Sequence, residues 1–117
     1  MKKMFFVGLV ALQAWSVDAS AKVITFDDIS IPGGNNIQIS NGYQGLNWDN
    51  FYVQNSTNDL TIINSGYHAG AVSGNNVGFN AYSNPASFSS DTEFNFISSY
   101  VTRAWSNGTT HFAGYNG

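Results

Sequence analysis

The 117-residue chain has no cysteine, two prolines and few charged residues, which make up 9% of the sequence. Without cysteine, no disulfide can stabilise the fold. A domain of roughly 100 residues that depends on its apolar core alone is only marginally stable. Bound calcium or further strands would add stability. The low charge and 15% aromatic content are unlike those of a disordered chain. The composition instead indicates an extracellular β-protein with Ser, Thr and Asn on its outer faces.

Cationic side chains are almost absent beyond the N-terminus. In residues 22–117 only Lys22 and Arg103 oppose six carboxylates, which gives a net charge of −4; the carboxylates are Asp27, Asp28, Asp49, Asp59, Asp91 and Glu93. No basic patch remains to neutralise phosphates, so we expect no nucleic-acid partner.

Residues 1–21 have the three parts of a secretory signal peptide. Lys2 and Lys3 form a basic start, residues 4–15 are mostly apolar, and Ala19-Ser20-Ala21 is a small-residue cleavage site. The apolar run is shorter than the roughly 18 residues of a spanning helix, although a retained anchor is the alternative. We expect residues 22–117 to be secreted, without membrane contact after cleavage.

The most informative stretch is G-Y-Q-G-L-N-W-D-N-F-Y-V, residues 42–53. Leu46 and Trp48 share one face of a strand, and Phe51 and Val53 share a face that is out of step with the first pair. The slip predicts a bulge or bend at Asp49-Asn50. We interpret Trp48 as a core residue, with a surface platform for a sugar ring as the alternative.

Further short β-type runs follow one another along the chain. They lie at residues 23–26, 37–39, 60–63, 77–79, 86–89 and 93–96, and around Asn107-Gly108 at 100–105 and 110–115. The last two, joined by an Asn-Gly turn, predict a hairpin. Turn signals roughly every 8 to 12 residues favour an all-β sandwich. The closing Gly114-Tyr115-Asn116-Gly117 reads as a turn that opens a hairpin, so we expect the domain, residues 22–117, to be truncated at its C-terminus.

Several phrases together resemble a family of secreted β-sandwich proteins of bacteria and lower eukaryotes. They are V-I-T-F-D-D (23–28), residues 42–53, S-G-Y (65–67), A-V-S-G (71–74), and F-N-F (94–96) leading to Tyr100 and Trp105. Some bacterial members carry a PEP-CTERM sorting signal, which is absent here. The resemblance implies a galactose-binding-like jelly roll, the fold of many carbohydrate-binding modules, in a domain that runs past residue 117. It implies no established functional residue.

Asp27 and Asp28 end the first β-type run and are candidate calcium ligands, because calcium prefers carboxylate and carbonyl oxygens. The resemblance agrees, since galactose-binding-like modules often hold a structural calcium near their N-terminal strand. The alternative is a turn in which Asp27 or Asp28 accepts hydrogen bonds from nearby backbone N–H groups. Apart from this calcium we expect no cofactor.

Aromatic side chains near turns and strand ends are the main candidates for ligand binding. A tyrosine has an apolar face for stacking on a sugar and a polar tip for hydrogen bonding, although it also suits ordinary strand packing. The candidates have Asn neighbours; they are Tyr43, Tyr52, Tyr67, Tyr82 and Trp105.

Catalytic patterns are weak. His68 and His111 have no carboxylate at a recognised ligand spacing, and no G-x-S-x-G motif is present, with Ser73-Gly74 in an ordinary turn. Asp49, Asp59, Asp91 and Glu93 could supply the acid pair of a glycoside hydrolase, but no spacing pairs them.

Asn55-Ser56-Thr57 and Asn107-Gly108-Thr109 are N-glycosylation sequons in predicted turns, relevant in a eukaryote, or chance matches in an Asn-rich chain. Together these patterns predict a secreted, non-catalytic binding module whose ligand is a glycan. An extracellular structural or surface-matrix protein is the alternative, and a glycoside hydrolase is the third.

Overall fold

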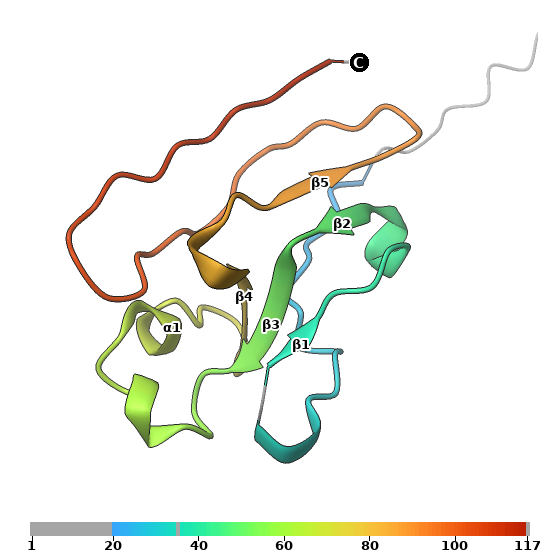
Figure 1. Ribbon diagram of the computed structural model, residues 1–117. Coiled ribbons are helices and arrows are strands. Elements are labelled where there is room, and N and C mark those ends of the chain that lie inside the picture. The colour runs from blue at the N-terminus through green and yellow to red at the C-terminus, as the bar shows by residue number, and fades with distance from the viewer. Residues whose placement is uncertain (1–19, 35, 117) are drawn as a thin grey trace, which may run out of the picture.

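The computed structural model describes residues 20–34 and 36–116, and its regular structure is mainly antiparallel sheet (Figure 1). The larger sheet has the strand order β1 (Ile37–Gln38), β3 (Phe51–Asn55), β4 (Asn76–Asn80). The smaller sheet pairs β2 (Asn47–Asp49) with β5 (Ser87–Ser89). The all-β prediction is therefore confirmed.

Short helical turns connect the strands. The single α-helical turn is α1 (Gly66–Ala69), and the 3-10 turns in the described part are η1 (Pro32–Gly34), η2 (Tyr43–Gly45), η3 (Leu60–Ile62) and η4 (Ala81–Ser83). Side-chain caps start two of them: Asp59 accepts from the backbone N–H of Thr61, and Ser65 accepts from that of Tyr67. Both turns therefore begin at a residue that satisfies a free backbone donor.

The bend predicted at Asp49-Asn50 is confirmed, and it moves the chain from the smaller sheet to the larger one. Asn50 has a positive φ of 53°, a conformation that Asn tolerates better than most residues. Its side-chain Nδ2 donates to the carbonyls of Ala81 and Pro85 at 3.0 and 3.1 Å. The bend thus also holds η4 and the start of β5.

Trp48 is a core residue, as the sequence predicts. It is 8% exposed and packs with Ile39 and Val53, which is fully buried. The rings of Phe26, Phe51 and Phe88 lie 5.3–5.8 Å from its ring. Its indole Nε1 donates to the backbone oxygen of Tyr43 at 2.9 Å, which satisfies the one polar atom of the side chain. Residues of both sheets therefore share one core.

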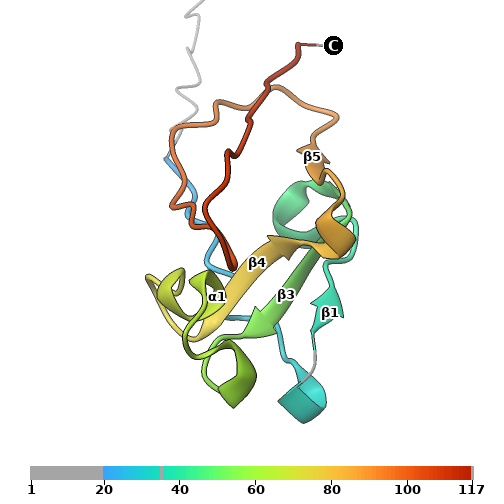
Figure 2. The same ribbon diagram turned by 60° about the vertical axis from the view of Figure 1, so that its left-hand side comes forward.

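Alternation along β3 separates this core from a second surface. Phe51 belongs to the core face, and Tyr52 pairs with Phe79 of β4 on the opposite face. Val77 and Phe79 lie on one face, as predicted. Figure 2 shows β3 and β4 side by side with α1 and the turn of the C-terminal segment close to β4. The larger sheet thus has an inner face and an aromatic outer face.

Several strand predictions are wrong. Residues 23–26 contain no strand, and residues 60–63 form η3 and its C-cap. Residues 93–96 are not a strand, and no hairpin forms around Asn107-Gly108. These runs have suitable side chains but no strand in register beside them, and a ladder needs both.

The C-terminal segment runs along the outside of the domain. Residues 90–116 contain no strand, and Figure 1 shows them passing β5, reaching α1 and turning back. The backbone N–H of Gly66 in α1 donates to the oxygen of Ala104 at 2.7 Å. This bond attaches the segment to the outer side of the larger sheet.

The predicted signal peptide, residues 1–21, lies almost entirely outside the described residues. Within the described part, none of the helical elements has the length and apolarity that crossing a membrane requires.

We expect Gly78→Ala to destabilise the fold. The ring of Phe26 covers Gly78 so closely that an added Cβ would lie 2.9 Å from Cε2, and the ring cannot withdraw without leaving the core. Overpacking of this kind costs about 1–3 kcal/mol, to be measured by urea unfolding. Gly114→Ala is the control, because no atom lies within 4 Å of its Cβ position. Equal midpoints for the two variants would contradict this packing.

Candidate functional site

Four of the five predicted ligand-binding aromatics lie in one continuous row. Tyr82 contacts Tyr52, Tyr52 contacts Phe79, Phe79 contacts Tyr67, and Tyr67 contacts Trp105. The distances between successive ring centroids are 6.1, 6.0, 5.3 and 5.9 Å. We call these five side chains the aromatic row.

Different elements supply the members of the aromatic row. Tyr52 and Phe79 are cross-strand neighbours on β3 and β4, so the register of the sheet fixes their contact. Tyr67 lies in the first turn of α1, whose start is held by the Ser65 cap. Its ring meets that of Phe79 edge to face, at 81°. The sheet and α1 therefore hold the middle of the row rigidly.

Tyr82 is the exposed end of the row at η4. Its side chain is 81% exposed, and its backbone has a φ of 57°, which is unusual for a bulky residue. Amide groups on both sides hold this turn: Asn50 Nδ2 donates to the oxygen of Ala81, and Asn80 Nδ2 donates to that of Asn84 at 2.8 Å. The fold thus maintains a strained backbone that presents a ring to solvent.

Trp105 is the exposed end of the row at the C-terminal segment. It is 66% exposed, and its ring meets Tyr67 edge to face at 73°. Arg103, two residues before Trp105, donates from its guanidinium to the oxygen of Gly108 at 3.1 Å. This bond closes the turn that follows Trp105.

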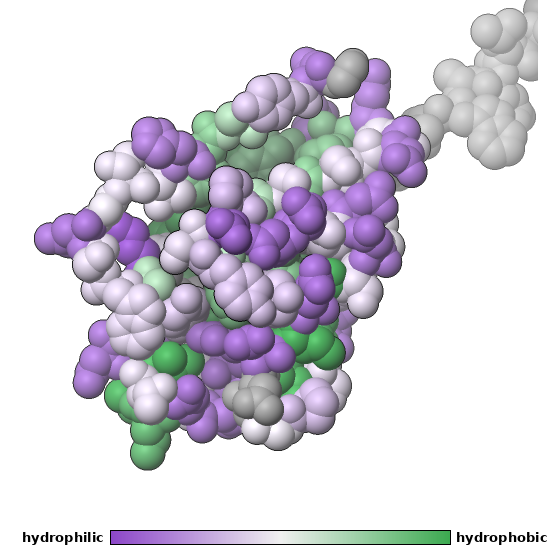
Figure 3. Space-filling view, viewed as in Figure 1, coloured by the Kyte–Doolittle hydropathy of each residue, from purple (hydrophilic) through white to green (hydrophobic). Residues whose placement is uncertain are grey.

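The aromatic row is uncharged at neutral pH. The pKa of Tyr52 lies above its ordinary value. The main cause is desolvation, which disfavours the charged phenolate. The neighbouring Tyr82 raises it further, through charge repulsion and through a hydrogen bond between the two side chains. In Figure 3 the surface over β3 is of intermediate to hydrophilic character, with hydrophobic areas near η3. Such a surface suits a neutral ligand that combines apolar faces with hydroxyl groups.

Tyr43, the fifth predicted aromatic, lies away from the row and beside the core. It is half-buried in η2, with its ring 6.0 Å from Phe26 and 6.1 Å from Trp48. Its hydroxyl donates to Asp28 Oδ1 at 2.5 Å. Burial and the Asp28 carboxylate raise its pKa to about 12. Its role in this structure is packing and hydrogen bonding.

Asp27 joins the N-terminal segment to the loop before β4. Its two carboxylate oxygens accept from Ser73 Oγ at 2.8 Å and from the backbone N–H groups of Gly74 and Asn76 at 3.0 and 3.1 Å. In return, Asn76 Nδ2 donates to the oxygens of Phe26 and Ile29 at 2.8 and 3.0 Å. We call this reciprocal set of bonds the Asp27–Asn76 clamp. The sequence offered, as the alternative to calcium, a local turn in which nearby backbone N–H groups bond to the carboxylate; the backbone donors here instead lie 47 and 49 residues further along the chain.

Asp28 accepts from Tyr43 and from Gln44 Nε2, the latter at 3.1 Å. The described residues contain no cluster of three or more His, Cys, Asp or Glu side chains that could hold a metal. Calcium at Asp27 and Asp28 stays a prediction. Burial alone raises the pKa of Asp27, but the bonds from Ser73, Asn76 and Gly74 outweigh it and hold the pKa below its ordinary value.

The candidate catalytic residues are spread over different elements. Asp49 ends β2, Asp59 caps η3, and Asp91 and Glu93 lie in the exposed C-terminal segment. His68 lies in α1 with Nδ1 3.0 Å from the oxygen of Ser56, and His111 is exposed in the C-terminal segment. These positions give no support for a paired-carboxylate site.

The two sequons differ in their surroundings. Asn55 ends β3, and its Oδ1 accepts from the N–H and the hydroxyl of Thr57 at 2.9 and 2.8 Å. Asn107 is exposed in the turn after Trp105. Asn107 is therefore the more accessible acceptor, and glycosylation stays a prediction for both.

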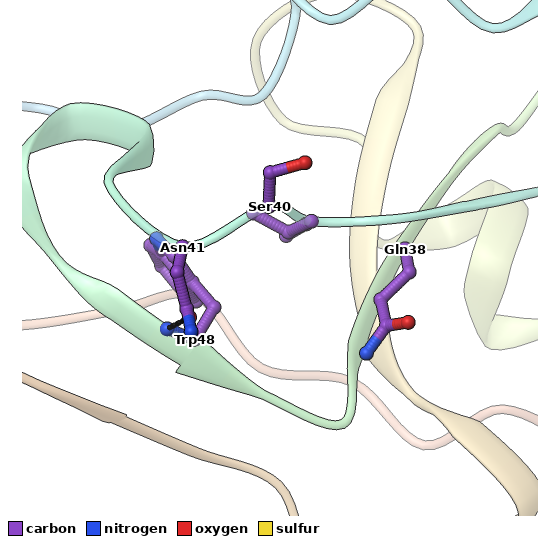
Figure 4. A pocket seen from close by; sticks show the side chains of 5 residues that line it. Gln38, Ser40, Asn41 and Trp48 are labelled. Atoms are coloured by element: carbon purple, nitrogen blue, oxygen red, sulfur yellow. Dashed lines mark hydrogen bonds between the residues drawn. The ribbon is translucent and has the colours of Figure 1, made fainter.

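An open hollow of about 310 Å³ lies beside the core, lined by residues 38–41 and Trp48. Figure 4 shows Trp48 and Asn41 on one side of it and Gln38 on the other. Asn41 Oδ1 accepts from the backbone N–H of Trp48 at 2.6 Å. The lining residues are all uncharged, and the polar atom of the indole is already bonded. The hollow therefore offers less for recognition than the aromatic row.

The sequence did not identify Phe79 as the centre of the row. Its placement on one face with Val77 was available, but only the register with Tyr52 shows that it connects the rings of the sheet to that of Tyr67.

Comparison of the chain with protein-family models, with curated proteins and with solved structures finds no match.

We expect Asp27→Asn to lower stability in a pH-dependent manner. The amide replaces one acceptor oxygen by a donor that faces Ser73 and two backbone N–H groups, which costs about 1 kcal/mol at an exposed position. Because the pKa of Asp27 is lower in the folded state than its ordinary 3.8, its contribution is complete above that value and is lost as the pH falls through the folded pKa.

Urea unfolding at pH 7 and at pH 3 measures this effect. The gap between wild type and Asp27→Asn is expected to narrow at pH 3, whereas the exposed Asp91→Asn control stays near wild type at both values. A gap that is unchanged at pH 3 would contradict the ionic character of the clamp.

Proposed function

We propose that the chain is a secreted, non-catalytic module that binds carbohydrate on the aromatic row. The single observation that carries the proposal is the gathering of Tyr82, Tyr52, Tyr67 and Trp105 into one contiguous set of rings through Phe79. Sugars present C–H faces that stack on aromatic rings and hydroxyl groups that bond to polar tips. A surface of tyrosines and one tryptophan supplies both.

The backbone of Tyr82 supports the same proposal. A bulky residue at φ 57° costs about 1–3 kcal/mol, and its ring, 81% exposed, gains little burial within the chain. Strain of this kind gathers at binding sites, where it presents a side chain to a ligand. The two antiparallel sheets are compatible with the galactose-binding-like jelly roll that the sequence resembles, and that finer fold is part of the proposal.

An extracellular structural or surface-matrix role is the second candidate. The observation that favours it is the C-terminal segment, where exposed apolar side chains lie on chain without a strand; they are Phe94, Phe96, Ile97 and Val101. Exposed apolar extended chain favours association with other copies. Sedimentation of the purified protein tests this role: self-association without glycan binding would favour it.

The carbohydrate proposal is tested with a glycan array and with pull-down on insoluble polysaccharides. We expect Tyr82→Ala and Trp105→Ala each to weaken binding about tenfold, or about 1.4 kcal/mol, because each removes one exposed ring. Tyr100→Ala and Tyr115→Ala are matched controls, since these side chains are 85% and 90% exposed and lie outside the row. Equal binding by all four variants, or no binding by wild type, would overturn the proposal.

A further inference from the structure

The aromatic row has two accessible ends and a half-buried middle. Tyr82 and Trp105 are exposed, whereas Tyr52, Phe79 and Tyr67 between them are partly covered. Four ring-to-ring steps of 5.3–6.1 Å separate the two ends. Three partly covered rings therefore lie between the two exposed ones.

The Trp105 end depends on how the C-terminal segment lies on α1. The N–H of Gly66 donates to the oxygen of Ala104 at 2.7 Å, and a Cβ on Gly66 would overlap the backbone oxygen of Arg103. A Cβ on Gly70 would lie 2.6 Å from Cγ2 of Thr102. We call residues 102–105 the strap. The two glycines let the strap lie directly on α1, which sets its Trp105 beside Tyr67.

We propose that the row selects an extended oligosaccharide of several units, with one sugar stacked on Tyr82 and another on Trp105. This inference rests on the proposed function. Gly66 is then a positioning residue for the second contact, since it touches the strap and not the ligand. Two linked contacts raise affinity, because the second forms at a high effective concentration once the first is made.

The neutral chemistry of the row favours a sugar chain over a charged polymer. None of its five side chains carries a charge at neutral pH, and Arg103, the cationic neighbour on the strap, is bonded to the oxygen of Gly108. The rings meet edge to face at 83°, 81° and 73° along the row, so its ring faces point in different directions. A chain whose successive sugars can rotate about their linkages matches such a surface better than a rigid planar ligand does.

The test is calorimetric titration with cello-, xylo- and chito-oligosaccharides of one to six units. In at least one series we expect affinity to rise about tenfold or more from the disaccharide to the hexasaccharide. Tyr82→Ala and Trp105→Ala each abolish that rise, and Tyr100→Ala retains it. Binding that is independent of length would overturn this inference and leave the proposed function standing. Failure of all three series to bind would overturn this inference, and only a glycan array that also shows no binding would overturn the proposed function.

Gly66→Ala tests the positioning role. We expect it to remove the rise with chain length, as Trp105→Ala does, while the affinity for the disaccharide stays within about twofold of wild type. Acrylamide should quench more tryptophan fluorescence in this variant, because Trp105 leaves Tyr67 while Trp48 stays buried. Gly114→Ala is the control, since its Cβ position is open.

A second variant keeps the positioning role testable if Gly66→Ala does not fold. Thr102→Gly loosens the strap without adding an atom to α1, and it is expected to give the same loss of length dependence. Retention of the rise with chain length in a folded Gly66→Ala or Thr102→Gly protein would overturn the assignment of the strap.

Discussion

The Asp27–Asn76 clamp is the interaction on which the rest of the structure depends. Asp27 accepts from the loop that leads into β4, and Asn76 at the start of β4 donates back to Phe26 and Ile29. The clamp therefore joins residues nearly fifty positions apart by hydrogen bonds from each side to the other. In a chain without cysteine, these bonds perform the joining that a disulfide performs in many secreted domains.

The clamp matters because it places Phe26. That ring lies over Gly78 and meets Trp48 at 5.8 Å, so it closes the inner face of the larger sheet over the core. Once the N-terminal segment covers this face, the alternation of β3 leaves Tyr52 on the other one, where Phe79, Tyr67 and Trp105 join it. Because successive side chains of β3 point to opposite faces of the sheet, this one strand contributes both to the core and to the candidate site.

The parts of the fold that could be predicted are those that depend on local pattern. The apolar residues before and after Asp49-Asn50 lie on alternating positions that are out of step, and this pattern predicted the bend. The apolar neighbours of Trp48 predicted its place in the core. The aromatic residues near turns gave most of the row. Its contiguity could not be predicted, because it depends on a register between strands that are some 25 residues apart.

The errors have a common cause. Residues 60–63, 93–96 and the runs around Asn107-Gly108 have suitable side chains for strands, but a strand also needs a neighbour at the right edge. At residues 60–63 a local interaction favours a helical turn over a strand. Asp59 Oδ1 accepts hydrogen bonds from the backbone N–H and the hydroxyl of Thr61, which caps the start of that turn. Similarly, Asp27 has the chemistry of a calcium ligand, and only the folded chain shows which donors its oxygens meet.

Two aromatic residues have a strained backbone, and they differ in whether contacts within the chain offset the strain. Phe26 and Tyr82 both have a positive φ, at 65° and 57°. The strain at Phe26 is offset within the fold, since its ring packs against Trp48 and its carbonyl accepts from Asn76. The ring of Tyr82 is largely exposed, and its one aromatic partner among the described residues is Tyr52.

In a domain whose net stability is of the order of 5–15 kcal/mol, a strained turn that presents a ring to water is a measurable loss. Amide groups from two separate elements, Asn50 at the bend and Asn80 at the end of β4, maintain that turn. A purely packed scaffold gains nothing from this arrangement. A surface that takes a ligand on the exposed ring does, and for this reason we propose a binding role in preference to a structural one.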